Sequence, residues 1–224
     1  MLAHGAVAGL LLRYAYPRIA PERRRALMGW WSGKLLRILN VHAHVRGEGP
    51  AAGAVMIAAN HVSWLDIFLI SSVRPTRFIA KGEVRDWPIV GWIADKAGTL
   101  FVRRGQWRDT ARINAKVHEA LVEGDCLGLF PEGFTTEGDT LLCFHAALFA
   151  PAVANRALVR PTAIRYTKPD GALCREASFI GERSFMESLA LIIGERRIDA
   201  NLEFGEPIAT VASLLGLSPP DRRR

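Results

Sequence analysis

The chain has 224 residues, half of them hydrophobic, and a formal net charge of +7. This composition is typical of a folded domain with a sizeable core and excludes an intrinsically disordered chain. The positive charge favours an anionic partner, whether nucleic acid, a phosphorylated substrate or an anionic membrane surface.

The first 39 residues are predicted to form a helical, membrane-associating region. Residues 2–16 are apolar, but the stretch is too short to span a bilayer and has no signal-peptide cleavage site. Residues 21–39 have a helical pattern that combines an arginine cluster with Trp30 and Trp31, which suits a helix in the headgroup region of an anionic bilayer. An amphipathic helix packed on the domain fits this pattern equally well.

Strand and helix patterns alternate along the rest of the chain. Strands are predicted at 41–45, 54–58, 76–80, 98–102, 126–130, 159–166 and 198–204. Helices are predicted at 64–73, 88–96, 106–122, 141–153 and 185–193. This alternation predicts an α/β fold with a mixed, mostly parallel central sheet flanked by helices. No linker divides residues 40–216, which are predicted to be one domain followed by a basic tail at 217–224.

The sequence predicts neither a metal site nor a disulfide framework. Cys126, Cys143 and Cys174 show no CxxC or zinc-finger spacing, which indicates reduced thiols on the cytosolic side of the membrane. His42 and His44 share one face of a predicted strand, but no third metal ligand is apparent.

Four polar clusters lie at or just after the ends of predicted strands, where ligand clefts of open α/β sheets occur. They are residues 60–66, 101–104, 130–133 and 159–161. In the first cluster, His61 and Asp66 lie five positions apart in a strand-to-helix turn. The carboxylate can hold one imidazole nitrogen there and leave the other nitrogen to accept a proton. These residues alone fit a purely stabilising hydrogen bond equally well.

The four clusters, in this order, resemble the glycerolipid acyltransferase family, which includes bacterial 1-acylglycerol-3-phosphate acyltransferases. Residues 60–66 read NHVSWLD and are similar to the family's NHxSxxD block. Residues 98–104 read GTLFVRR and are similar to its G-x-x-F-[IV]-x-R block. FPEG at 130–133 and VRPTAI at 159–164 resemble the third and fourth blocks, and the match extends from about residue 55 to 163.

The resemblance implies an O-acyltransferase without a cofactor, which moves a fatty acyl group from acyl-CoA or acyl carrier protein to a lysolipid hydroxyl. The first expectation for the acceptor is 1-acylglycerol-3-phosphate, which would give phosphatidic acid. The resemblance further implies catalysis at the cytoplasmic face of the inner membrane by a peripheral or monotopic protein that binds an anionic membrane surface.

The same resemblance assigns roles to individual residues. His61 would be the catalytic base and Asp66 the acid that orients it. The acceptor phosphate would be bound by Arg104 and secondarily by Arg103. The remaining expectations are a substrate contact or arginine anchor at Glu132, oxyanion donors near Gly133, added positive charge from Lys81, and supporting roles for Asn60, Ser63 and Pro131.

One departure from the family pattern affects the expected acceptor. The commonest third block continues with Thr-Arg, whereas this chain has Phe134 and Thr135. Loss of that arginine removes a phosphate ligand and admits lyso-ornithine lipid or another lysophospholipid as the acceptor.

Two further classes of function receive less support from the sequence. A lipid-binding protein without turnover is an alternative, but it would need neither His61 nor Asp66. Nucleic-acid binding is disfavoured, because the arginines are scattered and no basic recognition helix is apparent.

Overall fold

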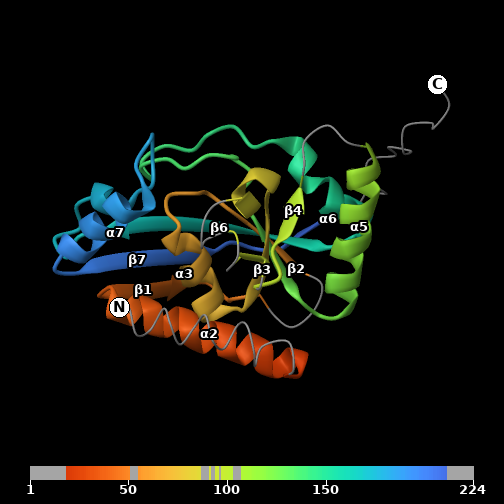
Figure 1. The fold of residues 1–224 in the computed structure, drawn as a ribbon, viewed down its shortest axis with the longest axis horizontal. Helices are drawn as coiled ribbons and strands as arrows, with labels where there is room; N and C mark the ends of the chain where they lie inside the picture. The colour runs from red at the N-terminus through yellow and green to blue at the C-terminus, as the bar shows by residue number, and fades with distance from the viewer. Residues whose placement is uncertain are drawn as a thin grey trace.

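A mixed β-sheet with helices on both faces forms the centre of the protein (Figure 1). The structure is a computed structural model that describes residues 19–50, 55–86, 91, 94–95, 97–102 and 107–210. The eight strands are β1 (Val41–Arg46), β2 (Val55–Ala59), β3 (Thr76–Lys81), β4 (Leu100–Val102), β5 (Cys126–Leu129), β6 (Leu158–Thr167), β7 (Ile198–Phe204) and β8 (Ile208–Ala209). The α-helices are α2 (Pro21–Ile38), α3 (Leu65–Val73), α5 (Trp107–Val122), α6 (Ala150–Ala154) and α7 (Phe185–Gly194).

The sheet has the order β1-β7-β6-β2-β5-β3-β4, and β8 pairs with β6. The strands from β6 to β4 are all parallel, while β6 pairs antiparallel with β7 and β8. The predicted fold class, a mixed and mostly parallel sheet, is confirmed. Because β2, β5, β3 and β4 run in the same direction, the turns that follow them emerge at one edge of the sheet.

Each face of the sheet has its own hydrophobic core, since successive strand side chains point to opposite faces. In β2, Ile57 and Ala59 pack with buried residues of α3 and α7, whereas Met56 and Ala58 pack with α5 and Ala152 of α6. All five residues of β2 are buried, as expected for a central parallel strand. This burial gives the turn after β2 a rigid starting point.

Helix α2 packs on the domain. Leu36 and the following Leu39 are almost fully buried in the core beside α3 and β1. Trp30 is 50% exposed, and the Lys34 ammonium lies 4.9 Å from its ring centroid. No helix in the described part of the chain is long and apolar enough to cross a bilayer. The membrane role of residues 1–39 stays a prediction, and residues 1–18 lie outside the described structure.

The prediction of a helix at 141–153 is wrong for residues 141–145. Residues 141–145 have no regular structure, Ala146–Phe149 form a 3₁₀ turn, and only Ala150–Ala154 form an α-helix. The Leu142 N–H donates to the Glu132 carboxylate at 2.8 Å, and the His145 N–H donates to the Pro131 carbonyl at 2.9 Å. The two N–H groups therefore donate to residues of the preceding turn, and they do not form the hydrogen bonds of an α-helix. Most of the helix predicted at 88–96 lies outside the described residues.

Candidate active site

The turn between β2 and α3 brings His61 and Asp66 into direct contact. Asp66 lies in the first turn of α3 and is fully buried, while the His61 side chain is 22% exposed. His61 Nδ1 lies 2.7 Å from Asp66 Oδ2. Because a carboxylate accepts hydrogen bonds, the imidazole carries a proton on Nδ1 and presents Nε2 as the acceptor.

The buried carboxylate of Asp66 is surrounded by donors. Its Oδ2 also accepts the backbone N–H groups of Val62 at 2.8 Å and Ser63 at 3.0 Å. Its Oδ1 accepts the Tyr166 hydroxyl at 2.7 Å. Burial raises the pKa of Tyr166 well above its ordinary value, and the charge of Asp66 raises this pKa further, so the phenol remains a donor. These bonds compensate the cost of burying a carboxylate.

Aromatic stacking fixes the plane of the imidazole. The Phe130 ring stacks on His61 with centroids 3.9 Å apart and an interplanar angle of 10°. The Phe130 ring also stacks with the Phe78 ring, and their centroids are 5.5 Å apart, so the three rings form a row. Gly128 makes room for this row, because a Cβ atom there would lie 2.7 Å from the Phe78 ring. The Asp66 bond and the ring stack therefore orient the same imidazole.

The turn after β5 supports the turn that carries His61 through Glu132, which is 1% exposed. Glu132 Oε1 accepts the backbone N–H of His61 at 2.8 Å, and Oε2 accepts that of Leu142 at 2.8 Å. Both carboxylate oxygens thus bind backbone, which is a different role from the expected substrate contact or arginine anchor. The Gly133 N–H donates to the Phe130 carbonyl at 3.1 Å, and Gly133 has a φ of 72° that favours glycine. A part for Gly133 in oxyanion binding stays a prediction.

Asn60 and Pro131 both connect the site to other segments. Asn60 Oδ1 accepts the Ile164 N–H at 2.7 Å, and Asn60 Nδ2 donates to the Ile164 carbonyl at 2.9 Å. This pair attaches the end of β2 to β6, and Pro131 supplies the carbonyl that binds His145. Ser63 is fully buried, and its Oγ has no hydrogen-bond partner in the described structure. The N-cap residue of α3 is Trp64.

The expected cationic residues are only partly located. The backbone of Lys81 ends β3 beside Val102 of β4, but its side chain is not described. Arg103 and Arg104 follow Val102 in the sequence and lie outside the described residues. Because β3 and β4 are parallel neighbours in the sheet that contains β2, Lys81 and Val102 end at the same sheet edge as the His61 turn.

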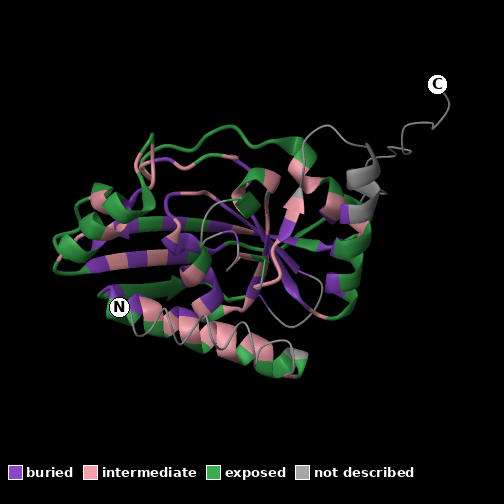
Figure 2. Cartoon of the chain, in the orientation of Figure 1, coloured by how far each residue is buried: buried purple, intermediate pink, exposed green. Residues whose placement is uncertain are grey.

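An exposed apolar segment continues from the site. Residues 139–147 are all exposed and form the green trace along the upper edge of Figure 2. We call this segment the strap. Its Leu141 is 65% exposed and Phe144 is 44% exposed, while Phe134, in the preceding turn, is 62% exposed. The Leu142–Glu132–His61 bonds connect the strap to the turn that carries His61.

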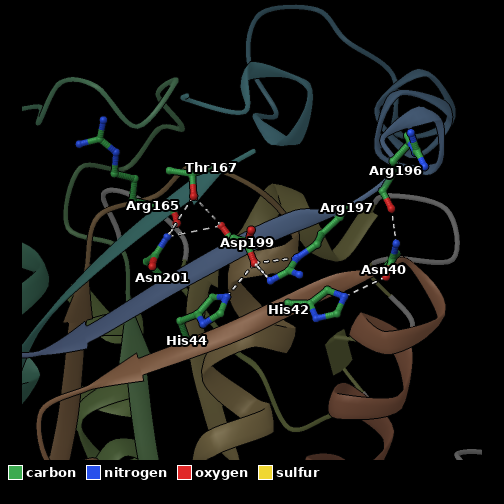
Figure 3. Close-up of polar contacts among 9 residues, drawn as sticks. All are labelled: Asn40, His42, His44, Arg165, Thr167, Arg196, Arg197, Asp199 and Asn201. Carbon is green, nitrogen blue, oxygen red and sulfur yellow. Dashed lines mark hydrogen bonds and ion pairs between the residues drawn. The ribbon is translucent and has the colours of Figure 1, made fainter. Parts of the chain in front are cut away.

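His42 and His44 make separate polar contacts away from this turn (Figure 3). His42 bonds to Asn40 at 2.9 Å, and His44 bonds to Asp199 at 2.7 Å. Arg197 also donates to Asp199. Among the residues with described positions, no group of three histidine, cysteine or acidic side chains could hold a metal ion.

Neither the Tyr166 contact nor the strap contact at Leu142 was predicted from the sequence. Residues 164 and 166 share one face of β6, so alternation could have placed Tyr166 beside Ile164. Nothing local could have linked it to Asp66, which is 100 positions away.

The chain matches known acyltransferases over most of its length. A sequence model of the acyltransferase family matches residues 40–165, which is more than half of the chain. The chain is 40% identical over 209 residues to a lyso-ornithine lipid O-acyltransferase from Pseudomonas aeruginosa, covering 92% of this chain and 80% of that protein. It is 41% identical over 161 residues to a 1-acyl-sn-glycerol-3-phosphate acyltransferase from Neisseria meningitidis, covering 71% of this chain and 63% of that protein.

The fold is also shared with a solved structure. The crystal structure of the 1-acyl-sn-glycerophosphate acyltransferase from Thermotoga maritima superimposes with a TM-score of 0.61 at 21% identity. The match covers 98% of this chain and 88% of that one. The family model and the Pseudomonas relative show that this chain is an enzyme of the acyltransferase family.

Proposed function

We propose that this enzyme is a lysolipid O-acyltransferase and that His61 is its catalytic base. The observation that carries this proposal is the His61–Asp66 pair. Asp66 occupies Nδ1, and the partly exposed ring presents Nε2 as a proton acceptor. The names of the relatives support a lysolipid as the acceptor.

In the proposed reaction the acceptor supplies the nucleophile. His61 Nε2 takes the proton of the lysolipid hydroxyl while its oxygen attacks the thioester carbonyl of the donor. The buried Asp66 carboxylate stabilises the imidazolium that forms. The new C–O bond forms, the C–S bond breaks, and the imidazolium returns the proton to the leaving thiolate. The thioester donor is acyl-CoA or acyl carrier protein, and no enzyme nucleophile is required.

Two observations favour lyso-ornithine lipid as the acceptor. The match to the Pseudomonas lyso-ornithine lipid enzyme covers more of both chains than the Neisseria match does. The arginine of the common third block is replaced by Thr135, whose hydroxyl donates to the Phe179 carbonyl. An acceptor without a phosphate has no need of that arginine.

The alternative acceptor, 1-acylglycerol-3-phosphate, is favoured by the retained arginines of the second block. Arg103 and Arg104 follow Val102 in the sequence, and Val102 ends β4 at the sheet edge that also carries the His61 turn. A guanidinium fork there would bind a phosphate in two places. Lys81 would add positive charge at the end of β3.

We also propose that catalysis occurs on a lipid surface, with the strap as the contact beside the active site. A lysolipid carries an acyl chain, so an enzyme that uses it gains from an apolar surface next to its base. The strap has exposed Leu141 and Phe144 and is bound to the catalytic turn through Glu132. The cytoplasmic face of the inner membrane is the proposed location, since acyl-CoA and acyl carrier protein are cytoplasmic donors.

An acceptor panel tests the proposed function. Purified enzyme is incubated with radiolabelled acyl-CoA or acyl carrier protein and with lyso-ornithine lipid, 1-acylglycerol-3-phosphate or another lysophospholipid. We expect an O-acylated product, the highest kcat/KM with lyso-ornithine lipid, and no product with His61→Ala. A higher kcat/KM with 1-acylglycerol-3-phosphate would reverse the order of acceptors. Failure to acylate any of them with either donor would contradict the proposal.

A further inference from the structure

Tyr166 contacts the side of the Asp66 carboxylate that faces away from His61. Asp66 Oδ2 is committed to His61, Val62 and Ser63, whereas Oδ1 accepts the Tyr166 hydroxyl at 2.7 Å. Both Tyr166 and Asp66 are buried, with exposures of 1% and 0%. Within the described structure, the tyrosine hydroxyl is the donor to Oδ1.

This hydroxyl contributes to the orientation of the carboxylate. Rotation about the Cβ–Cγ bond would displace both oxygens, so the Tyr166 bond to Oδ1 adds to the three bonds on Oδ2 in resisting that rotation. The fixed plane aims Oδ2 at His61 Nδ1. Strand β6 provides a rigid base for this contact, because Asn60 is bonded to both backbone groups of Ile164, two residues before Tyr166.

We propose that Tyr166 is a positioning residue for acyl transfer, which acts by holding Asp66 in the orientation that His61 requires. This inference rests on the proposed function, because it assumes that His61 is the base. Tyr166 lies behind the carboxylate and acts through Asp66. Its removal should therefore change the rate and pH dependence of the reaction more than the affinity for the acceptor.

The direct test is Tyr166→Phe, which removes only the hydroxyl. A carboxylate with one donor fewer concentrates its charge on Oδ2, so the His61–Asp66 pair holds a proton more tightly. We expect kcat to fall about tenfold or more, as for loss of a hydrogen bond to a charged group. The acceptor KM should stay within about twofold, and the acid limb of the kcat/KM profile should move to higher pH. The titratable side chains bonded to this turn in the described structure are Tyr166 and Glu132.

Thr167→Val provides a matched control on the same strand. It also removes one hydroxyl, but the Thr167 hydroxyl lies on the other face of β6 and contacts the Asp199 carbonyl at 3.4 Å. We expect its kcat and pH profile to match those of the wild type. Equal effects of the two substitutions, or an unchanged kcat and pH profile in Tyr166→Phe, would overturn the inference.

A second measurement applies even where Tyr166→Phe folds poorly. The chain has three tyrosines, and Tyr14→Phe with Tyr16→Phe leaves Tyr166 as the only one. Fluorotyrosine incorporated in this background reports on Tyr166 by ¹⁹F NMR. We expect its resonance to titrate together with the acid limb of activity and to lose that titration in Asp66→Asn. A ¹⁹F chemical shift that does not change with pH in either protein would contradict the coupling between Tyr166 and Asp66.

The results separate the inference from the proposed function. If His61→Ala remained active, the proposed function itself would be wrong. If His61→Ala were inactive while Tyr166→Phe behaved as wild type, only the positioning role would fail.

Discussion

At the residue scale, the imidazole of His61 is constrained from two directions. Asp66 binds its Nδ1, and the Phe130 ring stacks on its face. A base that is already oriented loses little entropy when the substrate hydroxyl arrives. These contacts leave Nε2 as the proposed proton acceptor.

Replacement of His61 by alanine should reduce acyl transfer by about 10²–10⁴-fold, the usual contribution of general-base catalysis. The loss should appear in kcat, measured as labelled product at saturating donor and acceptor. His118→Ala is a suitable control, because His118 lies on α5 and bonds to Asn155. Full activity in His61→Ala would show that another group removes the proton.

Substitution of Arg104 tests whether this residue binds the phosphate of the acceptor. With 1-acylglycerol-3-phosphate, Arg104→Ala should raise the acceptor KM about tenfold or more, because a charge-assisted hydrogen bond is lost. The donor KM should stay the same, and Arg103→Ala should have a smaller effect. An unchanged acceptor KM in Arg104→Ala, measured by initial rates, would remove Arg104 from the site.

At the element scale, the turn after β5 supports the turn after β2. Glu132 spans them by accepting one N–H from His61 and one from Leu142. The two strands are parallel neighbours, so their turns emerge side by side. The Glu132 carboxylate therefore stabilises the loop that carries His61.

Glu132→Gln should destabilise the protein by about 1–3 kcal/mol, because one amide –NH₂ would face a buried N–H donor. Urea unfolding followed by circular dichroism measures this change. Activity should fall as well, since the His61 backbone loses a contact. The exposed Glu119 on α5 provides the control, and Glu119→Gln should leave the unfolding midpoint unchanged. Equal unfolding midpoints for Glu132→Gln and Glu119→Gln would show that the Glu132 hydrogen bonds do not contribute to stability.

At the scale of the whole molecule, two surfaces could meet a membrane. Helix α2 lies along the lower edge of Figure 1, and the strap lies along the upper edge. The inner side of α2 is buried in the core through Leu36. A deletion of residues 1–39 would therefore damage the fold, and point substitutions give a sharper test.

Leu141→Ser with Phe144→Ser should weaken binding to anionic vesicles by about tenfold or more, since each buried apolar side chain contributes about 1.5–3 kcal/mol. Vesicle co-sedimentation measures the partition coefficient. Met186→Ser with Ile193→Ser on α7 is the matched control, because these residues are 68% and 54% exposed. Wild-type binding by the strap variant, together with a loss of binding in Trp30→Ser, would assign the contact to α2.

The acid stability of the molecule should depend on Asp199. Burial alone would raise the pKa of this carboxyl, but hydrogen bonds from His44 and Arg197 outweigh that effect and hold the pKa below its ordinary value (Figure 3). A depressed folded pKa gives stability that is present above the unfolded pKa of about 3.9 and is lost as the pH falls through the folded value.

Asp199→Asn should therefore flatten the fall in unfolding free energy below about pH 4. Urea titrations at a series of acidic pH values measure it. Glu206→Gln, at an exposed position, should keep the wild-type pH dependence. An identical acid profile in wild type and Asp199→Asn would rule out this contribution.

The sequence by itself determined the alternation of strands and helices, the mostly parallel sheet and the position of His61 and Asp66 in one turn. These features depend on residues close together in the chain, where hydrophobic periodicity and turn geometry act. The pair needs only the five-residue turn between β2 and α3.

Only the tertiary structure decided what surrounds that pair. The strand order β6-β2-β5 brings Tyr166 to Asp66 across 100 positions and Glu132 to His61 across 71. The fold also places the Leu142 N–H beside the Glu132 carboxylate. Their hydrogen bond helps to keep residues 141–145 from forming a helix. A buried carboxylate takes whichever donors the packed fold places beside it, and periodicity along the chain contains no information about those distant partners.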